Sequence, residues 1–349
     1  MTTPEPRRGS DENGASAKRR GPSMRDVAVL AGVSHQTVSR VLNGHNSIKD
    51  ETREKVLAAI ASVNYRRNSV ARTLATSRSQ RIGVIVDSAG LYGPNSTLRA
   101  IEESAWEAGY AVSAITVSGN SAITTQEALD SLIAQGVDAL CVIAPRITSV
   151  DTIRQSTHDL PTLLVKAEGE EQHHTLSVDQ RLGAELAMQH LLDLGHTKIL
   201  HIAGPQDWLD ARGRAKAWRT SLTQAGLPVP EMIIGDWTAD FGYQTALQLA
   251  NRGDFTAVFV ANDQMALGLL HGFHQAGLRV PEDVSIVGFD DLPESKYYLP
   301  ALTTVRQDFH EVGRRSVDVL LAALQDEEAP MRTLIEPELV VRESTARLQ

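Results

Sequence analysis

The sequence has little that suits secretion, membrane insertion or thiol chemistry. It contains one cysteine in 349 residues, so no intrachain disulfide can form. Because Cys141 lies in the apolar run ALCVIA, we expect a buried structural thiol. No apolar run approaches the length of a membrane span, and the amino terminus is polar, unlike a secretory signal. We therefore expect a cytoplasmic protein.

The common catalytic and metal-binding motifs are also absent. There is no Walker phosphate loop, no G-x-G-x-x-G after the first predicted strand and no G-x-S-x-G elbow. Two histidine pairs have no carboxylate or cysteine set at metal-ligand spacing, so we expect no metal and no cofactor. A sugar hydrolase that uses Asp263 and Asp290 is the enzymatic alternative to a non-catalytic protein.

Positive charge is scarce overall but concentrated near the amino terminus. The net charge is -9, yet residues 1–80 hold 14 Lys and Arg against 7 Asp and Glu, whereas the remainder holds 20 against 36. A basic segment of this kind is typical of a DNA-binding head, and the acidic body should repel DNA. The first 22 residues have the composition of a disordered tail, which either attracts phosphates or only solubilises the chain.

Residues 24–43, MRDVAVLAGVSHQTVSRVLN, predict two short helices joined by a tight turn. The first helix has its apolar positions at Met24, Val27, Ala28, Leu30 and Ala31. It ends at Gly32, where the backbone needs a residue that tolerates positive φ. Ser34 caps the second helix, in which Val38, Val41 and Leu42 share the buried side. An ordinary pair of antiparallel helices with a solvated polar face is the alternative.

The opposite side of the second helix carries side chains that suit DNA. We expect base contacts from His35, Gln36 and Arg40, because glutamine can bridge adenine N7 and N6 and arginine can bind guanine O6 and N7. Shorter polar side chains are expected to position the head on the phosphates. These are Ser34, Thr37, Ser39 and Asn43. Together they predict a major-groove reader.

From residue 81 onward, short β-rich runs alternate with helical patterns, which predicts parallel sheets covered by helices on both faces. The runs are IGVIV, YAVSAITV, ALCVIA, TLLVK, KILHIA, AVFVA and VSIVGF. The helical patterns end on glycines such as Gly136, Gly195 and Gly277. About 260 residues of this texture should form two lobes, with ligand bound where the carboxyl ends of the strands face the cleft.

Several motifs together resemble one family. They are AGVSHQTVSRVLN, TREKVLAAIASVNYRRNSVARTLA, GDW, VANDQMALG, GLRVPEDVSIVGFDD and LTTVRQDFHEVG. Over about residues 24–345 the chain resembles the LacI/GalR family of bacterial transcription regulators. The resemblance implies a small all-α helix-turn-helix head and a periplasmic-binding-protein-like α/β core of two doubly wound parallel-sheet lobes.

The resemblance also implies domain boundaries. We expect a tail (1–22), a head (23–67), a hinge helix with linker (68–80) and a core (81–349), the core consisting of an N-lobe (about 81–178 and 307–336) and a C-lobe (about 179–306 and 337–349). The hinge sequence NSVARTLA is helix-prone but too short to be stable alone. By resemblance, two copies pair on the minor groove, where Asn68 and Ala71 contact DNA and Leu74 inserts and kinks it. A simple linker is the alternative.

For the small molecule, the resemblance implies a sugar pocket at strand ends. Arg212, Asn262 and Asp290 match the hydroxyl-binding positions of the family's lactose-responsive pattern, and Trp237 matches its stacking aromatic. The other matching pocket positions are Leu91, Pro94, Gln307 and Phe309. Asp290 directly follows the predicted strand VSIVGF, which independently places it at a strand end.

Two positions depart from that pattern. Lys166 stands where the pattern has an acidic pocket residue, and Trp208 stands where it has a serine. An ammonium group cannot accept a hydroxyl proton, although it can bind an anionic substituent or pair with Asp290. A β-galactoside is therefore the leading effector, with another glycoside or an acidic sugar as alternatives.

These observations predict a repressor of sugar-utilisation genes that a small sugar releases from a palindromic operator by a population shift. Corepression, with the opposite sign, is an alternative. A transport-type sugar-binding protein would need export and no DNA-binding head. Twofold-related heads match a palindromic site, so we expect a homodimer. We expect no membrane association. A tetramer is not expected, since the extra heptad helix of tetrameric members has no counterpart in VVRESTARLQ.

Overall fold

The computed structural model describes residues 22–42, 45, 47–65, 78–88, 90–117, 124–143, 153, 160–165 and 173–348. The chain divides into two compact units, Met1–Ser77 and Arg78–Gln349, and each is described by itself. Some predicted positions lie outside the described residues. They are the tail to residue 21, the end of the predicted head (66–67), the predicted hinge from 68 to 77 with Asn68, Ala71 and Leu74, and the single residues Asn43 and Lys166.

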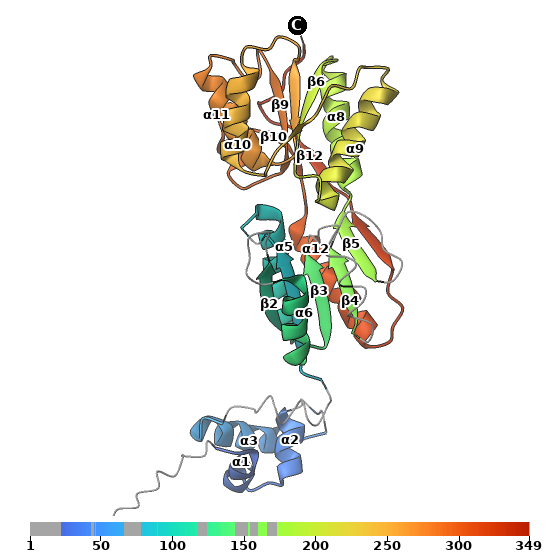
Figure 1. Ribbon diagram of the computed structural model, residues 1–349. Coiled ribbons are helices and arrows are strands. Elements are labelled where there is room, and N and C mark those ends of the chain that lie inside the picture. Colours follow the sequence, from blue (N-terminus) through green and yellow to red (C-terminus); the bar gives the residue numbers. More distant parts are fainter. Residues whose placement is uncertain are drawn as a thin grey trace, which may run out of the picture. The chain divides into compact units, whose positions relative to one another are not determined.

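The first unit contains the predicted helix-turn-helix. Its helices are α1 (Met24–Ala31), α2 (His35–Leu42) and α3 (Asp50–Ser62) (Figure 1). Gly32 ends α1 with φ of 65°, and the Ser34 hydroxyl accepts the Thr37 backbone N–H at 3.1 Å at the start of α2. Both predictions are confirmed, and the cause is local: only a residue without Cβ adopts that turn cheaply, and serine satisfies a helix N–H that otherwise lacks a partner.

The head has a small core in which all three helices take part. It includes Val27 from α1, Val38 and Val41 from α2 and Val56 from α3. Leu30, which the helical periodicity of α1 grouped with the apolar positions, is 57% exposed. The buried side of α1 is therefore narrower than its sequence pattern indicates.

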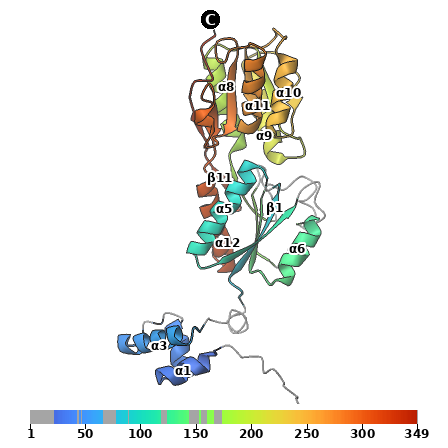
Figure 2. The same ribbon diagram turned by 90° about the vertical axis from the view of Figure 1, so that its left-hand side faces the viewer.

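The second unit contains two six-stranded sheets, and the predicted α/β fold is confirmed. The first sheet has the order β11-β5-β4-β3-β1-β2, and all its strands are parallel. Its strands are β1 (Arg81–Asp87), β2 (Ala111–Val117), β3 (Ala139–Ile143), β4 (Thr162–Val165), β5 (His174–Val178) and β11 (Arg332–Ile335). Helices α5 (Tyr92–Glu107) and α12 (Phe309–Leu324) cover one face, and α6 (Thr125–Ala134) covers the other (Figure 2).

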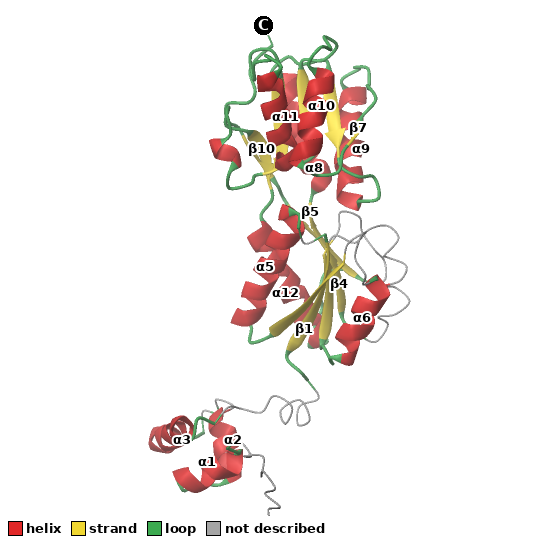
Figure 3. Ribbon diagram, turned by 60° about the vertical axis from the view of Figure 1, so that its left-hand side comes forward, coloured by secondary structure: helices red, strands yellow, loops and turns green. Residues whose placement is uncertain are grey.

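The second sheet has the order β12-β10-β9-β8-β6-β7 and is parallel except for its edge strand β12. Its strands are β6 (Ile199–Ala203), β7 (Ile233–Ile234), β8 (Ala257–Val260), β9 (Ser285–Asp290), β10 (Thr303–Arg306) and β12 (Glu338–Val340). The other helices of the described residues are α8 (Gln180–Asp193), α9 (Leu209–Gln224), α10 (Ala239–Leu249), α11 (Asp263–Gln275) and the short η1 (Ser295–Tyr297). Figures 1 and 3 show the helices packed on this sheet.

Successive side chains along a strand point to opposite faces of the sheet, so the core of each lobe has two layers. In β1, Val84 packs with the layer under α5 and α12, whereas Ile85 packs with the layer under α6. Cys141, in β3, is fully buried, as expected, and burial raises the pKa of its thiol to about 12. Strands buried on both faces read as continuous apolar runs, which is why their sequences were recognisable.

The chain passes between the two sheets three times. It leaves the first sheet after β5, returns to it after β10 and leaves it again after β11. The crossover segments are therefore 179, 307–308 and 336–337. After the second crossover, α12 packs closely against α5, where a Cβ on Gly313 would lie 2.4 Å from the Ala100 backbone. Among the described residues, no helix is long and apolar enough to cross a membrane.

Candidate functional site

Helix α2 presents the polar side chains predicted to read DNA. His35, Gln36 and Arg40 are exposed, while Val38 and Val41 lie in the core of the head. A helix whose apolar side is fixed against two neighbours must present its other side at a constant angle. The arrangement suits insertion of α2 into a major groove.

The shorter polar residues of α2 have a second, structural task. Besides accepting the Thr37 N–H, the Ser34 hydroxyl lies 2.9 Å from the Thr37 hydroxyl, so these two side chains hold the start of the helix. Ser34 is exposed, and Thr37 and Ser39 are half-buried. The positioning role predicted for these residues is compatible with this geometry, because a capped helix N-terminus also faces the phosphates it would bind.

The core unit contains a cavity between its two sheets, with about 670 Å³ of space free of atoms, part of it open to solvent. It lies at the carboxyl ends of the strands, where open α/β sheets bind ligands. Eight of the ten predicted pocket residues line it: Leu91, Pro94, Trp208, Trp237, Asn262, Asp290, Gln307 and Phe309. Lys166 lies outside the described residues. Arg212 is not among the lining residues.

The basic group of the cavity is Arg214, two residues from the one we predicted. Helix α9 begins at Leu209, and Asp210 and Arg214 are four residues apart on it, so both face the cavity. Arg212 falls about 200° round the helix from both of them and is exposed. The resemblance identified the correct turn of sequence, but the helical phase decides which arginine points inward.

Four side chains form a closed ring of polar contacts in the cavity. Asp290 accepts a hydrogen bond from Gln307 (2.7 Å), and Gln307 accepts one from Gln180 (2.8 Å). Gln180 accepts from Arg214 Nε (2.8 Å), and Arg214 Nη2 lies 3.8 Å from Asp290 Oδ1. Gln180 begins α8 immediately after the first crossover, and Gln307 lies in the second crossover. Chain segments far apart in sequence thus meet at the same group.

Burial sets the electrostatics of this ring. It raises the pKa of Asp290 to about 6, an effect that Arg214 and the hydrogen bond from Gln307 oppose and that Asp210 reinforces. Burial also lowers the pKa of Arg214, whose guanidinium lies 3.8 Å over the Phe289 ring and donates to the Ala261 carbonyl. A buried carboxylate beside a fixed guanidinium is suited to binding a ligand, because hydrogen bonds from ligand hydroxyls can replace its contacts with neighbouring charged groups.

Two tryptophans form an aromatic wall. The rings of Trp208 and Trp237 meet edge to face with centroids 5.8 Å apart, and both are 7% exposed. Trp237 has φ of 74°, a left-handed backbone conformation that residues other than glycine rarely adopt. Its ring lies against Gly204, where an added Cβ would lie 2.0 Å from Trp237 Cη2. The glycine is required for the ring to reach this place.

Asn262 acts first as support for that wall. Its Oδ1 accepts the Met265 N–H (3.0 Å) and caps α11, while Nδ2 donates to the Trp237 carbonyl (3.1 Å) and to Gln264 Oε1 (3.1 Å). Both amide hydrogens are therefore engaged, and one Oδ1 lone pair is left for a ligand. The predicted hydroxyl-binding role narrows to that single acceptor position.

The N-lobe side of the cavity is mostly apolar. Leu91 and Pro94 follow β1, and Phe309 begins α12 with its ring edge-on to Tyr92 at 5.6 Å. Burial raises the pKa of Tyr92. The cavity therefore has a polar wall from the C-lobe and a largely apolar wall from the N-lobe.

Sequence reasoning missed Gln180, Asp210 and Arg214. A signal existed for the last two, because an acid and a base four residues apart at the start of a helix share one face. Nothing in the local sequence marks Gln180, whose role depends on a partner 127 residues away.

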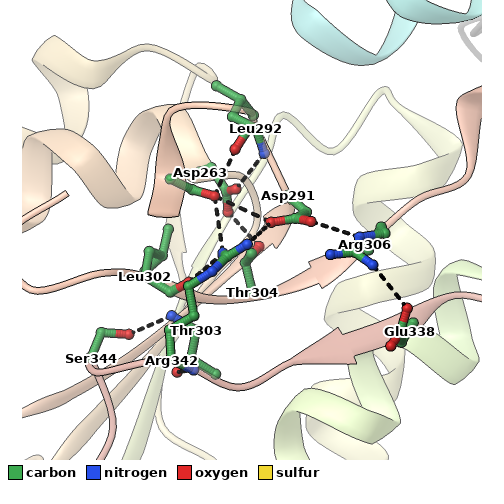
Figure 4. Close-up of polar contacts among 11 residues, drawn as sticks. Asp263, Asp291, Leu292, Leu302, Thr303, Thr304, Arg306, Glu338, Arg342 and Ser344 are labelled. Atoms are coloured by element: carbon green, nitrogen blue, oxygen red, sulfur yellow. Dashed lines mark hydrogen bonds and ion pairs between the residues drawn. The ribbon is translucent and has the colours of Figure 1, made fainter. Parts of the chain in front are cut away.

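Asp263, the second carboxylate weighed for hydrolysis, does not line the cavity. It is fully buried, and its two oxygens accept the Thr304 hydroxyl (2.5 Å) and the Leu292 N–H (2.9 Å) (Figure 4). Burial raises its pKa well above the usual value. Its contacts give it a structural task in holding the turn after β9.

Comparison with known proteins agrees with both units. Residues 23–68 match the model for bacterial regulatory proteins of the lacI family, and residues 188–345 match a periplasmic binding protein-like domain. The chain is 38% identical to the lactose operon repressor of Escherichia coli (strain K12) over 327 residues, 93% of this chain and 90% of that protein. The chain belongs to the LacI family.

Other LacI-family members show similar agreement. The ribose operon repressor of Escherichia coli (strain K12) is 32% identical over 304 residues, 86% of this chain and 92% of its own. A crystal structure of the Lac repressor dimer bound to operator and the anti-inducer ONPF matches with a TM-score of 0.85 and 36% identity, covering 94% of this chain and 100% of that one. This LacI-family chain is a DNA-binding transcriptional repressor, and its matched relatives are repressors rather than enzymes.

Proposed function

We propose that this repressor controls sugar-utilisation genes and that a neutral glycoside, with a β-galactoside as the leading candidate, releases it from its operator. The observation that carries the proposal is the cavity between the sheets, in which the Asp290, Gln307, Gln180 and Arg214 ring faces the aromatic wall.

The polar wall has the groups that a sugar needs. Asp290 can accept from two neighbouring hydroxyls, and Arg214 can donate to a hydroxyl oxygen while its Nε stays bonded to Gln180. Trp237 can cover the C–H face of a pyranose ring. A site built to pair hydroxyls discriminates strongly against analogues that lack them, because its buried polar groups would then lose their partners.

The charge of the described lining favours a neutral ligand. It contains two carboxylates, Asp210 and Asp290, and one guanidinium, Arg214. A ligand carboxylate would add a negative charge to a partly desolvated site that already has an excess of one, which costs free energy. An acidic sugar is therefore an outcome of the test rather than the leading effector.

On the DNA side, we propose that His35, Gln36 and Arg40 choose the bases, and that Ser34, Thr37, Ser39 and Asn43 position the head. We propose that the chain acts as a homodimer on a palindromic operator, as the twofold symmetry of paired heads requires. The hinge residues Asn68, Ala71 and Leu74 would then meet the minor groove, with Leu74 as the wedge.

The mechanism is a population shift. Sugar in the cavity contacts both lobes, so it favours the lobe arrangement in which those contacts are best and disfavours the one that holds the heads on DNA. The effect equals the difference in ligand affinity between the two arrangements, typically about 1–3 kcal/mol.

The test is operator binding by the full chain, with duplexes selected from a random pool and titrated with methyl β-D-galactoside, methyl β-D-glucoside and galacturonate. We expect the galactoside to weaken binding about 5- to 150-fold. Tighter binding in the presence of a sugar would establish corepression. A response to galacturonate alone would replace the neutral effector by an acidic one.

Two substitutions on one helix provide a matched control. Arg214→Met removes the cavity guanidinium, whereas Arg212→Ala removes an exposed one two residues away. We expect the first to abolish the sugar response and the second to retain it. A sugar response that survives Arg214→Met and also Asp290→Ala would place the effector site elsewhere.

A further inference from the structure

The turn that carries Asp290 into the cavity is held in an unusual conformation. Asp290 and Asp291 are consecutive residues with φ of 113° and 52°, both on the positive side that L-residues rarely adopt. Such a backbone persists only where its surroundings impose it. The side chain of Asp291, 9% exposed, identifies those surroundings.

Two arginines hold Asp291. Its carboxylate accepts from Arg342 Nη2 (2.6 Å) and from Arg306 Nε (2.7 Å) (Figure 4). Burial alone would raise the pKa of Asp291, but these hydrogen bonds outweigh it and lower the pKa. Arg342 also donates to the Leu302 carbonyl (2.8 Å), so it fixes Asp291 to the body of the C-lobe.

Arg306 connects the same turn to the crossovers. It is the last residue of β10, in register with Asp290, and the next residue, Gln307, donates to the Asp290 carboxylate. Residues 306 and 307 thus bind 291 and 290 respectively, side by side. Arg306 Nη1 also donates to Glu338 (3.1 Å), the first residue of β12 after the third crossover.

All three crossovers therefore meet at one turn. Gln180 reaches it from the first through Gln307, the second supplies Gln307 itself, and the third is reached through Arg306 and Glu338. A change of lobe arrangement must act on the crossover segments, since these are the covalent connections between the sheets. The carboxylate that would touch the ligand is thus hydrogen-bonded, directly or through Gln307, to residues in or next to the first two of these segments.

We propose that Arg306, anchored by Asp291, is a positioning residue that couples sugar at Asp290 to the second crossover and hence to operator affinity. The inference rests on the proposed sugar-released function. Arg306 does not line the cavity, so it acts on coupling rather than on sugar recognition. The Arg306 to Asp291 contact is the main one, because Glu338 is 70% exposed and surface pairs contribute little.

The experiment measures the dissociation constant of methyl β-D-galactoside with and without saturating operator, for full-length wild type, Arg306→Gln, Arg306→Lys and Arg181→Gln. The ratio of the two constants is the coupling. We expect a wild-type ratio of about 5- to 150-fold. Arg306→Gln should keep the sugar affinity without operator within about 3-fold of wild type but reduce the ratio below about 3-fold.

The other variants separate coupling from stability. Arg306→Lys retains a charge that can contact Asp291 and should restore the ratio to within about 3-fold of wild type. Arg181, an exposed arginine bound to Glu185 on α8, does not line the cavity, and Arg181→Gln should leave the ratio unchanged.

Three results would overturn the inference. If Arg306→Gln has the same ratio as the wild-type protein, the coupling role is overturned and the proposed function still stands. A lowered ratio that Arg306→Lys does not restore, with a matching loss of sugar affinity, would show a merely structural role. A wild-type ratio of one despite sugar binding would overturn the proposed function itself, and the coupling role with it.

Discussion

Acidification from pH 7.5 to pH 5 should weaken sugar binding through one group, Asp290. Burial holds the pKa of this carboxyl at about 6, so it is ionised at pH 7.5 and mostly protonated at pH 5. A carboxylate accepts hydrogen bonds from two sugar hydroxyls, whereas a carboxylic acid uses one oxygen as a donor. The ligand should therefore bind the ionised form.

The size of the effect follows from the ionised fraction. With a pKa of about 6, that fraction falls from about 97% at pH 7.5 to about 9% at pH 5, so the dissociation constant should rise about 10-fold. Acidification in this range does not destabilise the folded protein through Asp290. Its raised pKa contributes stability that is present below the unfolded value near 3.8 and is lost as pH rises through 6, so acidification favours the folded state at this group.

The assay is calorimetric titration of the full chain with methyl β-D-galactoside at half-unit pH steps, with circular dichroism to verify folding at each step. Asp290→Asn is the matched variant, since it has nearly the same shape and no titration. We expect it to bind more weakly at pH 7.5 and to lose the pH dependence.

Two results would refute the reasoning. Affinity that is constant between pH 7.5 and pH 5 would mean that Asp290 does not touch the ligand. Affinity that rises on acidification would mean that the ligand only desolvates this carboxyl and so prefers its neutral form.

Four further predictions concern the core, the head and the hinge. Burial lowers the pKa of His201 to about 4, so this group contributes stability that is present above pH 6.5 and is lost as pH falls. In urea denaturation, the free energy of unfolding should be about 2 kcal/mol lower at pH 5 than at pH 7 because of this group, and His201→Gln should lack this difference. Gly204→Ala should displace the Trp237 ring and weaken sugar binding at least about 10-fold with operator affinity retained, and unchanged sugar affinity would contradict the stacking role. Arg40→Ala should weaken operator binding by about 1–3 kcal/mol and relax the sequence preference at one base pair. If binding to random DNA weakened equally, Arg40 would contact a phosphate instead of a base. Leu74→Ala should reduce operator bending and affinity, and unaltered bending in a circular-permutation assay would exclude the wedge.

Local sequence was sufficient wherever a structure is formed by neighbours in the chain. The end of α1 at Gly32, the cap at Ser34 and the strand β3 around Cys141 were all predictable. Each depends on a conformational preference or an apolar run within a few residues. Strands β5, β7, β10, β11 and β12 were not predicted, because they lack the longer apolar runs that mark the other strands and are defined mainly by the strands they pair with.

The family resemblance identified positions along the chain but not the direction in which each side chain points. It brought Asp290, Trp237 and Phe309 to the cavity, yet it selected Arg212 where the phase of α9 places Arg214 inward. It also assigned Asn262 to the ligand without showing that its amide already caps α11 and holds the Trp237 carbonyl. Orientation depends on where a helix starts and which hydrogen bonds are already satisfied.

The sequence by itself determined the class of the protein: a basic helix-turn-helix head with a polar reading face and an α/β core of the LacI type. Those features depend on local propensity, charge and motif. Only the tertiary structure decided that Gln180, Gln307 and Asp290 share one polar ring and that Arg306 binds the neighbouring Asp291. These partners are separated by up to 127 residues, and contact at that separation exists only once the two sheets have folded and the chain has crossed between them three times.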